Sequence, residues 1–342
     1  MGRIFYYRSF DNSGKSITIM RIYILKRLIL AVFTLYFLAS ILFILFRMLP
    51  GDPTMTVLSS ALDPDVQQEM RHRFGLDRPL FEQYVIYLKN LATGEFGVSF
   101  QHGVKAFDII AEKFWNTIFL MVPAFILVFL VGITLGSYVA WKRGAFVEKA
   151  VVTGSMVLRS APDFWVGIVF IFIFAIKLDI FPTGHMRTPG YSATGTFDIF
   201  FSLDYLYHLA LPLLMMTLYY CCYPLLVMRT AMLEVLGEDF IDLCQAKGLS
   251  KKRVIFKHAM RASLLPIATS IALLGAYATA GSVLIETVFS WPGLGRLMVQ
   301  SVIYSDYPVA QACFLLIGVM VVCGNLLSDL LYGVLDPRIR YK

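Results

Sequence analysis

The sequence predicts an all-α polytopic membrane protein with six transmembrane helices. Apolar residues make up 58% of the chain and charged residues only 15%, with a mean hydropathy of +0.69, which places it in the membrane class. A helix needs about 20 apolar residues to cross the hydrocarbon core of a bilayer. Five stretches without Asp, Glu, Lys or Arg reach or approach that length: Leu28–Phe46, Thr117–Trp141, Leu206–Met228, Ala262–Ile285 and Tyr307–Ser328.

The remaining span, third in chain order, is less regular than the other five. Its apolar run Phe164–Ile176 is short, so it must include residues from the preceding Val151–Pro162, which contains Arg159 and is followed by Asp163. On one helix the i, i+4 spacing places these two charges on the same face. An intramembrane pair would then offset part of the roughly 2.5–3.5 kcal/mol insertion cost of an unpaired charge. We interpret Arg159 and Asp163 as a structural pair rather than a substrate site.

The distribution of Lys and Arg predicts the orientation of the chain. Nineteen of these residues lie before the first span, after the second, between the fourth and fifth, and after the sixth, whereas the two short loops on the other side hold only three. Short cytoplasmic loops carry the positive excess, so both termini are expected in the cytoplasm. The net charge of +7 therefore requires no nucleic-acid partner. The first apolar run is longer than the core of a signal peptide and should remain as an anchor.

The predicted spans divide the chain into successive parts. We expect a cytoplasmic segment 1–27, a first transmembrane helix 28–47, an extracytoplasmic segment 48–116, a five-helix core 117–332 that contains a polar loop 229–262, and a cytoplasmic tail 333–342. Met20 would itself make a natural start, so residues 1–19 are interpreted as a dispensable extension. Within 48–116, the apolar stripe of Arg78–Leu91 predicts an amphipathic helix with Pro79 in its first turn.

Motifs of catalysis or cofactor binding are missing from the sequence. There is no Gly-x-x-x-x-Gly-Lys-Ser/Thr loop for phosphates, no His-Glu-x-x-His and no Gly-x-Ser-x-Gly. We therefore predict no catalytic residue, no metal site and no cofactor bound by this chain. Charges within the spans are also scarce, which disfavours a proton-coupled secondary transporter. A channel or a membrane-embedded enzyme remains an alternative, although neither needs a docking loop.

The polar loop 229–262 is the most informative segment, because it lies between two long apolar runs. Phe240, Leu243 and Ala246 occur at helical spacing, and Gly248 can end that helix in the left-handed conformation. Ser250 can then begin a second helix. The first turn of that helix holds Lys251, Lys252 and Arg253, where the helix dipole disfavours cations by about 0.3–1 kcal/mol each. Either anionic lipid headgroups or an acidic groove on a partner protein would compensate.

Many ordered motifs give the chain a family resemblance. They are Met48-Leu-Pro-Gly-Asp-Pro53, Phe74-Gly-Leu-Asp-Arg-Pro79, Gly94-Glu-Phe-Gly97, Asn116-Thr117, Leu233-Glu-Val-Leu-Gly-Glu-Asp-Phe240, Ala246-Lys-Gly-Leu249, His258-Ala259, Leu265-Pro266, Glu286-Thr-Val-Phe-Ser-Trp-Pro-Gly-Leu-Gly295, Asp306-Tyr-Pro-Val309 and Asp329-Leu-Leu-Tyr-Gly-Val-Leu-Asp-Pro-Arg338. Over nearly its whole length the chain resembles the transmembrane permease subunits of bacterial ABC importers, specifically the dipeptide/oligopeptide branch. The resemblance implies the type I (MetI-like) importer permease fold, with a coupling helix-turn-helix loop.

In such permeases the loop between the fourth and fifth of these spans carries a Glu-Ala-Ala signature followed by a glycine. Gly248 matches that glycine, and the signature positions hold Asp242, Leu243 and Cys244, departures that are similar to the peptide-importer variant. The resemblance implies that the loop docks into a cleft of a separate ATPase subunit. The residues it assigns to this contact are Phe240, Asp242, Leu243, Cys244, Ala246, Lys247, Gly248, Leu249, Lys251, Lys252 and Arg253.

The resemblance also implies partners and a location. The chain would form half of a translocation pore in the bacterial inner membrane, together with a second homologous permease. Two cytoplasmic ATPase subunits would bind ATP-Mg, and an extracytoplasmic solute-binding protein would deliver di- or oligopeptides. Nickel, opines, glutathione or sugar conjugates are alternative cargoes of similar permeases. A second motif, with Glu286, Trp291, Pro292 and Gly293, could gate the outer mouth or contact the binding protein, but we favour a structural role in fixing a turn at the membrane interface.

Overall fold

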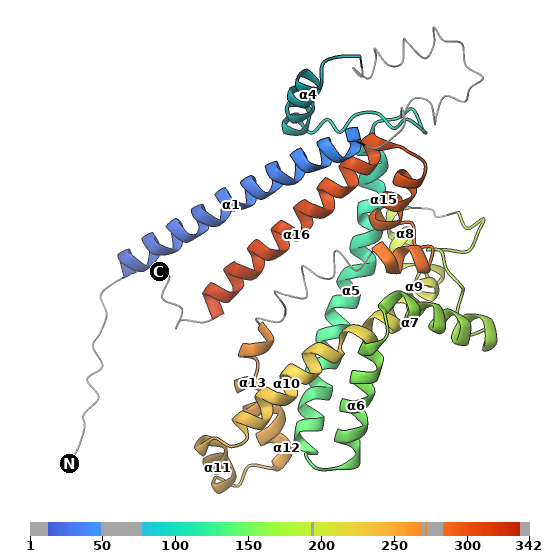
Figure 1. Ribbon diagram of the computed structural model, residues 1–342. Coiled ribbons are helices and arrows are strands. Elements are labelled where there is room, and N and C mark those ends of the chain that lie inside the picture. Colours follow the sequence, from blue (N-terminus) through green and yellow to red (C-terminus); the bar gives the residue numbers. More distant parts are fainter. Residues whose placement is uncertain (1–12, 49–76, 193–194, 269–270, 272–282, 336–342) are drawn as a thin grey trace.

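Helices form almost all of the regular structure in the computed structural model, which describes residues 13–48, 77–192, 195–268, 271 and 283–335 (Figure 1). Among these residues, the β-structure is an isolated antiparallel bridge between Val98 and Lys105. The prediction of an all-α protein is therefore confirmed. In chain order the named helices are α1 (Ser13–Met48), α4 (Leu80–Thr93), α5 (Ala106–Trp141), α6 (Phe146–Ser160), α7 (Asp163–Phe170), the π-helix η1 (Ile171–Lys177), α8 (Thr196–Phe201), α9 (Leu203–Tyr220), α10 (Cys222–Val235), α11 (Asp239–Ala246), α12 (Lys251–Arg253), the π-helix η2 (Val254–Ala259), α13 (Met260–Ala262), α15 (Leu294–Ile303) and α16 (Tyr307–Leu335).

Four of the predicted spans correspond to helices that are long and apolar enough to cross a membrane. These segments are Ile24–Met48, Ala106–Trp141, Leu203–Val235 and Tyr307–Leu326. They contain the predicted first, second and fourth spans and all but the last two residues of the predicted sixth. Most of the predicted fifth span, Ala262–Ile285, lies outside the described residues, as do residues 1–12, 49–76 and 336–342 of the predicted terminal and extracytoplasmic segments.

The third predicted span is not one straight helix. α6 ends at Ser160, α7 begins at Asp163, and the two helix directions differ by 105°. Proline after Ala161 disfavours the helical conformation at that residue, which is extended with ψ 149°. Arg159 and Asp163 therefore lie on different helices, and the prediction that they share one helical face is wrong.

α5 is the element that links the two ends of the described structure (Figure 1). Its first half packs against α15 and α16 through Ala106, Ile110 and Leu294. Its second half packs against α10 at very short range, since a Cβ added at Gly136 would lie 2.6 Å from the Leu225 carbonyl oxygen. Small residues of this kind let transmembrane helices approach closely.

α1, α4 and α16 form a separate layer beside the N-terminal half of α5. α1 runs along α16 (Figure 1), and Phe46 of α1 packs on Tyr307 with ring centroids 5.5 Å apart. α4 confirms the amphipathic helix predicted for this region, with Pro79 immediately before its first residue. Tyr84 and Tyr87 of α4 pack on Phe43, at centroid distances of 5.2 and 5.4 Å, so α4 lies against the end of α1.

Candidate functional site

The polar loop folds into a helix-turn-helix segment, residues 239–262, as its sequence predicts. α11 is followed by Gly248, whose φ of +74° is the left-handed conformation that favours glycine. The Gly248 N–H donates to the Gln245 carbonyl at 2.8 Å, and the Leu249 N–H donates to the Cys244 carbonyl at 3.3 Å. The chain then continues through α12, η2 and α13. Ser250 occupies the capping position before α12, but its side chain makes no capping hydrogen bond.

One side of the helix-turn-helix segment packs against α10, within the apolar core of the protein. Ile241, only 2% exposed, belongs to a buried cluster with Met228 and Met232 of α10 and with Val254 and Ile255 of η2. The helical spacing of Phe240, Leu243 and Ala246 does not include Ile241, so the prediction missed this residue. The signal was available, since Ile241 is the only β-branched aliphatic residue in α11.

The opposite side of the segment is exposed and carries most of the predicted docking residues, whereas Cys244 and Leu249 pack against the buried cluster that contains Ile241. Phe240 is 38% exposed and Leu243 is 56% exposed, so both apolar side chains are accessible to a partner. Cys244 and Leu249 are half-buried, whereas the remaining predicted residues are exposed: Asp242, Ala246, Lys247, Gly248, Lys251, Lys252 and Arg253. Phe240 also lines a shallow groove with residues that the sequence analysis missed: Lys257, His258, Arg261 and Ala262. The surface is thus both apolar and basic.

We expect the anchoring of this segment to depend on Ile241. Ile241→Ala should lower the free energy of local opening of residues 239–262 by about 3 kcal/mol, because it leaves a cavity between α10 and η2. Hydrogen-exchange mass spectrometry would measure this as faster exchange of the α11 amides. Leu243→Ala is the matched control and should change it by less than about 0.5 kcal/mol, since that side chain is exposed. Equal effects of the two changes would contradict this packing.

Arg159 and Asp163 are each held by a tyrosine of α9 and not by one another. The Arg159 guanidinium lies over the Tyr219 ring, 4.8 Å from its centroid. The Tyr220 hydroxyl donates to Asp163 Oδ2 at 2.8 Å, and the Phe164 N–H donates to Oδ1 at 2.7 Å. No ion pair joins these two described residues. The two charged groups therefore fix the bend between α6 and α7 against α9.

The second motif forms a buried arrangement, the Glu286 cluster, which consists of Asn116, Thr117, Glu286, Trp291, Pro292 and Gly293. The Glu286 side chain is fully buried, and its Oε1 accepts a hydrogen bond from the Thr117 hydroxyl at 2.7 Å. Its Oε2 accepts from the Arg296 N–H at 3.1 Å, in the first turn of α15. A carboxylate at this place satisfies a free N–H group and interacts favourably with the helix dipole.

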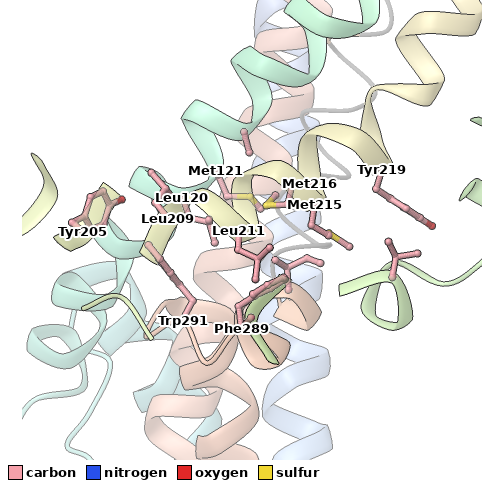
Figure 2. Packing of buried hydrophobic residues seen from close by; sticks show 14 of the residues in the cluster. Leu120, Met121, Tyr205, Leu209, Leu211, Met215, Met216, Tyr219, Phe289 and Trp291 are labelled. Atoms are coloured by element: carbon pink, nitrogen blue, oxygen red, sulfur yellow. The ribbon is translucent and has the colours of Figure 1, made fainter. Parts of the chain in front are cut away.

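Asn116 and Trp291 close the same cluster from both sides. The Trp291 indole N–H donates to the Asn116 carbonyl at 2.9 Å, and the Asn116 side-chain amide donates to the Pro292 carbonyl at 2.8 Å. Trp291 is completely buried and packs on Tyr205 with ring centroids 5.7 Å apart. Figure 2 shows Trp291 and Phe289 within a cluster that also contains Leu120, Leu209 and Met215. This geometry fits the structural role that we favoured for the motif.

The two candidate sites lie at opposite ends of α5. The Glu286 cluster includes Asn116 and Thr117, which lie in the first half of α5. The helix-turn-helix segment contacts Trp141, the last residue of α5, where the Trp141 and Phe256 rings are 6.2 Å apart. Among the described residues, no group of three or more His, Cys, Asp or Glu side chains could hold a metal ion. The geometry therefore offers an exposed, partly apolar and basic surface at one end and a buried, hydrogen-bonded junction at the other.

Comparison with known proteins covers both halves of the chain. Residues 132–341 match the family model described as "Binding-protein-dependent transport system inner membrane component", and residues 20–121 match the model for the N-terminal part of such membrane components. The oligopeptide transport system permease protein AppB of Bacillus subtilis is 34% identical over 94% of this chain and 100% of its own length. The di/tripeptide transport system permease protein DppB of Pseudomonas aeruginosa is 36% identical, and the dipeptide transport system permease protein DppB of Escherichia coli is 34% identical, each over 94% of this chain and 99% of the relative.

These matches extend over the elements that form the two sites. The first family model includes the helix-turn-helix segment and most of the Glu286 cluster, and the second includes Asn116 and Thr117. The relatives are matched over nearly their full length, so the similarity is not confined to one module. The chain therefore belongs to the inner membrane component family of binding-protein-dependent transport systems.

Proposed function

We propose that this chain is a permease subunit of an ATP-driven peptide importer and that its helix-turn-helix segment docks on a separate ATPase subunit. The observation that carries the proposal is the two-sided construction of the segment. Ile241 holds one side on α10, while Phe240 and Leu243 remain exposed. Phe240 shares a groove with the basic residues Lys257 and Arg261. An apolar centre with charged surroundings is typical of a protein interface. This combination also favours a partner protein, rather than lipid alone, as the explanation for the basic residues Lys251, Lys252 and Arg253.

The proposed orientation follows from the Lys and Arg distribution. The helix-turn-helix segment faces the cytoplasm, where ATP-Mg is bound by the partner subunits and not by this chain. Both termini lie on that same side, and the Glu286 cluster lies toward the opposite face of the inner membrane. A second homologous permease completes the pore, and an extracytoplasmic solute-binding protein delivers the cargo. In this assignment the coupling residues are those of the exposed side, with Gly248 as the turn between the two helices.

Peptides are the proposed cargo because several relatives carry names of peptide systems: an oligopeptide permease, a di/tripeptide permease and two dipeptide permeases are among them. The same machinery with nickel, an opine, glutathione or a sugar conjugate is the alternative. A proton-coupled carrier or a channel fits the exposed docking surface less well, since neither requires an ATPase contact.

Reconstitution of the complete complex in proteoliposomes tests the proposal. With the partner permease, both ATPase subunits and the binding protein present, we expect a radiolabelled tripeptide to accumulate only when ATP is supplied. A non-hydrolysable ATP analogue and omission of the binding protein are the controls, and each should stop uptake. Accumulation driven by a proton gradient without ATP would refute the ATP-driven mechanism. Uptake of Ni²⁺ in place of the peptide would refute the peptide assignment.

A further inference from the structure

A charged pair near the helix-turn-helix segment has no part in the proposed docking surface. Glu148, in the first turn of α6, and Arg229, in α10, have side chains that are 8% and 28% exposed. Arg229 Nε donates to Glu148 Oε1 at 2.8 Å, and Nη2 donates to the same oxygen. The Gly144 N–H donates to the other oxygen, Oε2, at 2.5 Å. Both oxygens of a largely buried carboxylate therefore have partners, unlike those of an ordinary surface ion pair.

Three helices converge on this pair. Gly144, with φ +84°, forms the turn from α5 to α6, and its N–H aligns the carboxylate. Gly136 of α5 lies directly against the α10 backbone, since an added Cβ would lie 3.3 Å from the Arg229 backbone nitrogen. Arg229 is consequently fixed to α5 by backbone packing and to α6 by charge.

The same part of α10 supports the helix-turn-helix segment. Met228 and Met232, which flank Arg229, pack on Ile241 of α11. α10 also leads directly into α11, because only three residues separate Val235 from Asp239. A displacement of the helix-turn-helix segment would therefore act on the residues around Arg229, as well as on α5, which packs on the same cluster.

α6 and α7 extend from this point toward the Glu286 cluster. The bend between them is attached to α9, where the Tyr219 hydroxyl donates to the Ala161 carbonyl at 3.0 Å. Beyond the bend, Gly167 of α7 lies against Val288 and Phe289, because an added Cβ would be 3.2 and 3.4 Å from their side chains. Those two residues closely follow Glu286 in the chain. The angled α6–α7 unit thus contacts α10 at one end and Val288 and Phe289, next to the Glu286 cluster, at the other.

We propose that Glu148 and Arg229 are a positioning pair, through which movement of the helix-turn-helix segment is passed to the angled α6–α7 unit and on to the Glu286 cluster. This inference rests on the proposed ATP-driven function. Two hydrogen bonds from Arg229 to one Glu148 oxygen join α10 to α6, so loss of the pair weakens the connection between these helices while the apolar packing of the docking segment remains. A pair that is largely removed from water also holds its geometry better than one on an open surface.

The test is the amount of peptide transported per ATP hydrolysed, measured in proteoliposomes that contain the complete complex. Glu148→Gln can still accept the Gly144 N–H but loses its charge, and Arg229→Gln removes the other partner. We expect either variant to retain ATP hydrolysis but to transport at least about fivefold less peptide per ATP, within the usual range of coupling between sites. The double variant should lose no more than the single variants, because the two side chains act as a unit. Lys149→Gln, an exposed neighbour on the same helical turn, is the matched control and should behave as the wild type.

Two results would overturn the inference. One is a transport-to-ATP ratio that matches the wild type in both single variants, even if their yield is lower, because it would leave the pair with a structural role only. The other is a double variant whose loss equals the product of two independent losses. Failure of the proposed function is distinguishable from both, since the wild-type complex would then show no ATP-dependent peptide uptake.

Discussion

Gly293→Ala is expected to lower the free energy of unfolding by about 3 kcal/mol, the combined result of overpacking and of a displaced buried carboxylate. An added Cβ would lie 2.5 Å from the Glu286 carboxyl carbon, and that carboxylate has no free space to move into. It would have to leave the Thr117 hydroxyl, the Arg296 N–H, or both. The φ of Gly293 is −99°, so steric overlap and not backbone strain is the cause. Unfolding of the purified protein in mixed micelles, followed by tryptophan fluorescence, measures the effect.

Gly154→Ala is the matched control for this experiment. Gly154 lies in α6 with no heavy atom within 4 Å of an added Cβ. Alanine also has the higher helix propensity, so this change should be neutral or slightly stabilising. If Gly293→Ala were tolerated as well as Gly154→Ala, the Glu286 cluster would not be the buried, hydrogen-bonded junction described above.

Leu243→Asp is expected to reduce ATP-driven peptide uptake about thirtyfold, the effect of losing roughly 2 kcal/mol at a central interface residue. The side chain is 56% exposed, so the substitution should leave folding and membrane insertion unchanged. It removes the apolar contact and introduces a negative charge on a segment whose exposed cations, among them Lys247 and Lys251, suit an acidic partner groove. Co-purification of the ATPase subunits with the variant permease, together with uptake in proteoliposomes, measures both binding and transport.

Leu243→Met is the control that shows whether lower uptake results from loss of the apolar contact or from any substitution at this position. Methionine keeps an apolar side chain of similar volume and should retain most of the uptake. Full ATPase binding and full uptake by Leu243→Asp would show that the partner contacts another surface. Loss of uptake in both variants, with ATPase binding intact, would likewise contradict a docking role for this side chain.

Several features of the fold were predictable because they depend on neighbouring residues only. Apolar stretches of membrane-spanning length predicted α1, α5, α9–α10 and α16, and Gly248 marked the turn of the helix-turn-helix segment because a positive φ is easily adopted only by glycine. The bend after Ser160 could also have been predicted. Pro162 disfavours helix at Ala161, but the i, i+4 spacing of Arg159 and Asp163 was given more weight.

The buried face of α11 could not be predicted from the α11 sequence alone. Phe240, Ile241 and Leu243 are all apolar, and the position of α10 determines that Ile241 is buried while the other two are exposed. The same holds for Glu148 and Arg229, which are separated by 81 positions in the chain. A Glu in the first turn of α6 and an Arg in the middle of α10 give no indication that they meet.

The sequence by itself determined the class of protein, the apolar spans, the place of the polar loop and its glycine turn, since composition and local backbone preference are sufficient for these. Only the tertiary structure decided which faces are buried and which polar groups meet. Glu286 reaches Thr117 across 169 positions, and Trp291 reaches Asn116 across 175. A fully buried carboxylate is stable only when its hydrogen-bond partners are already in place. Packing of the helices supplies those partners, and no local pattern in the chain specifies them.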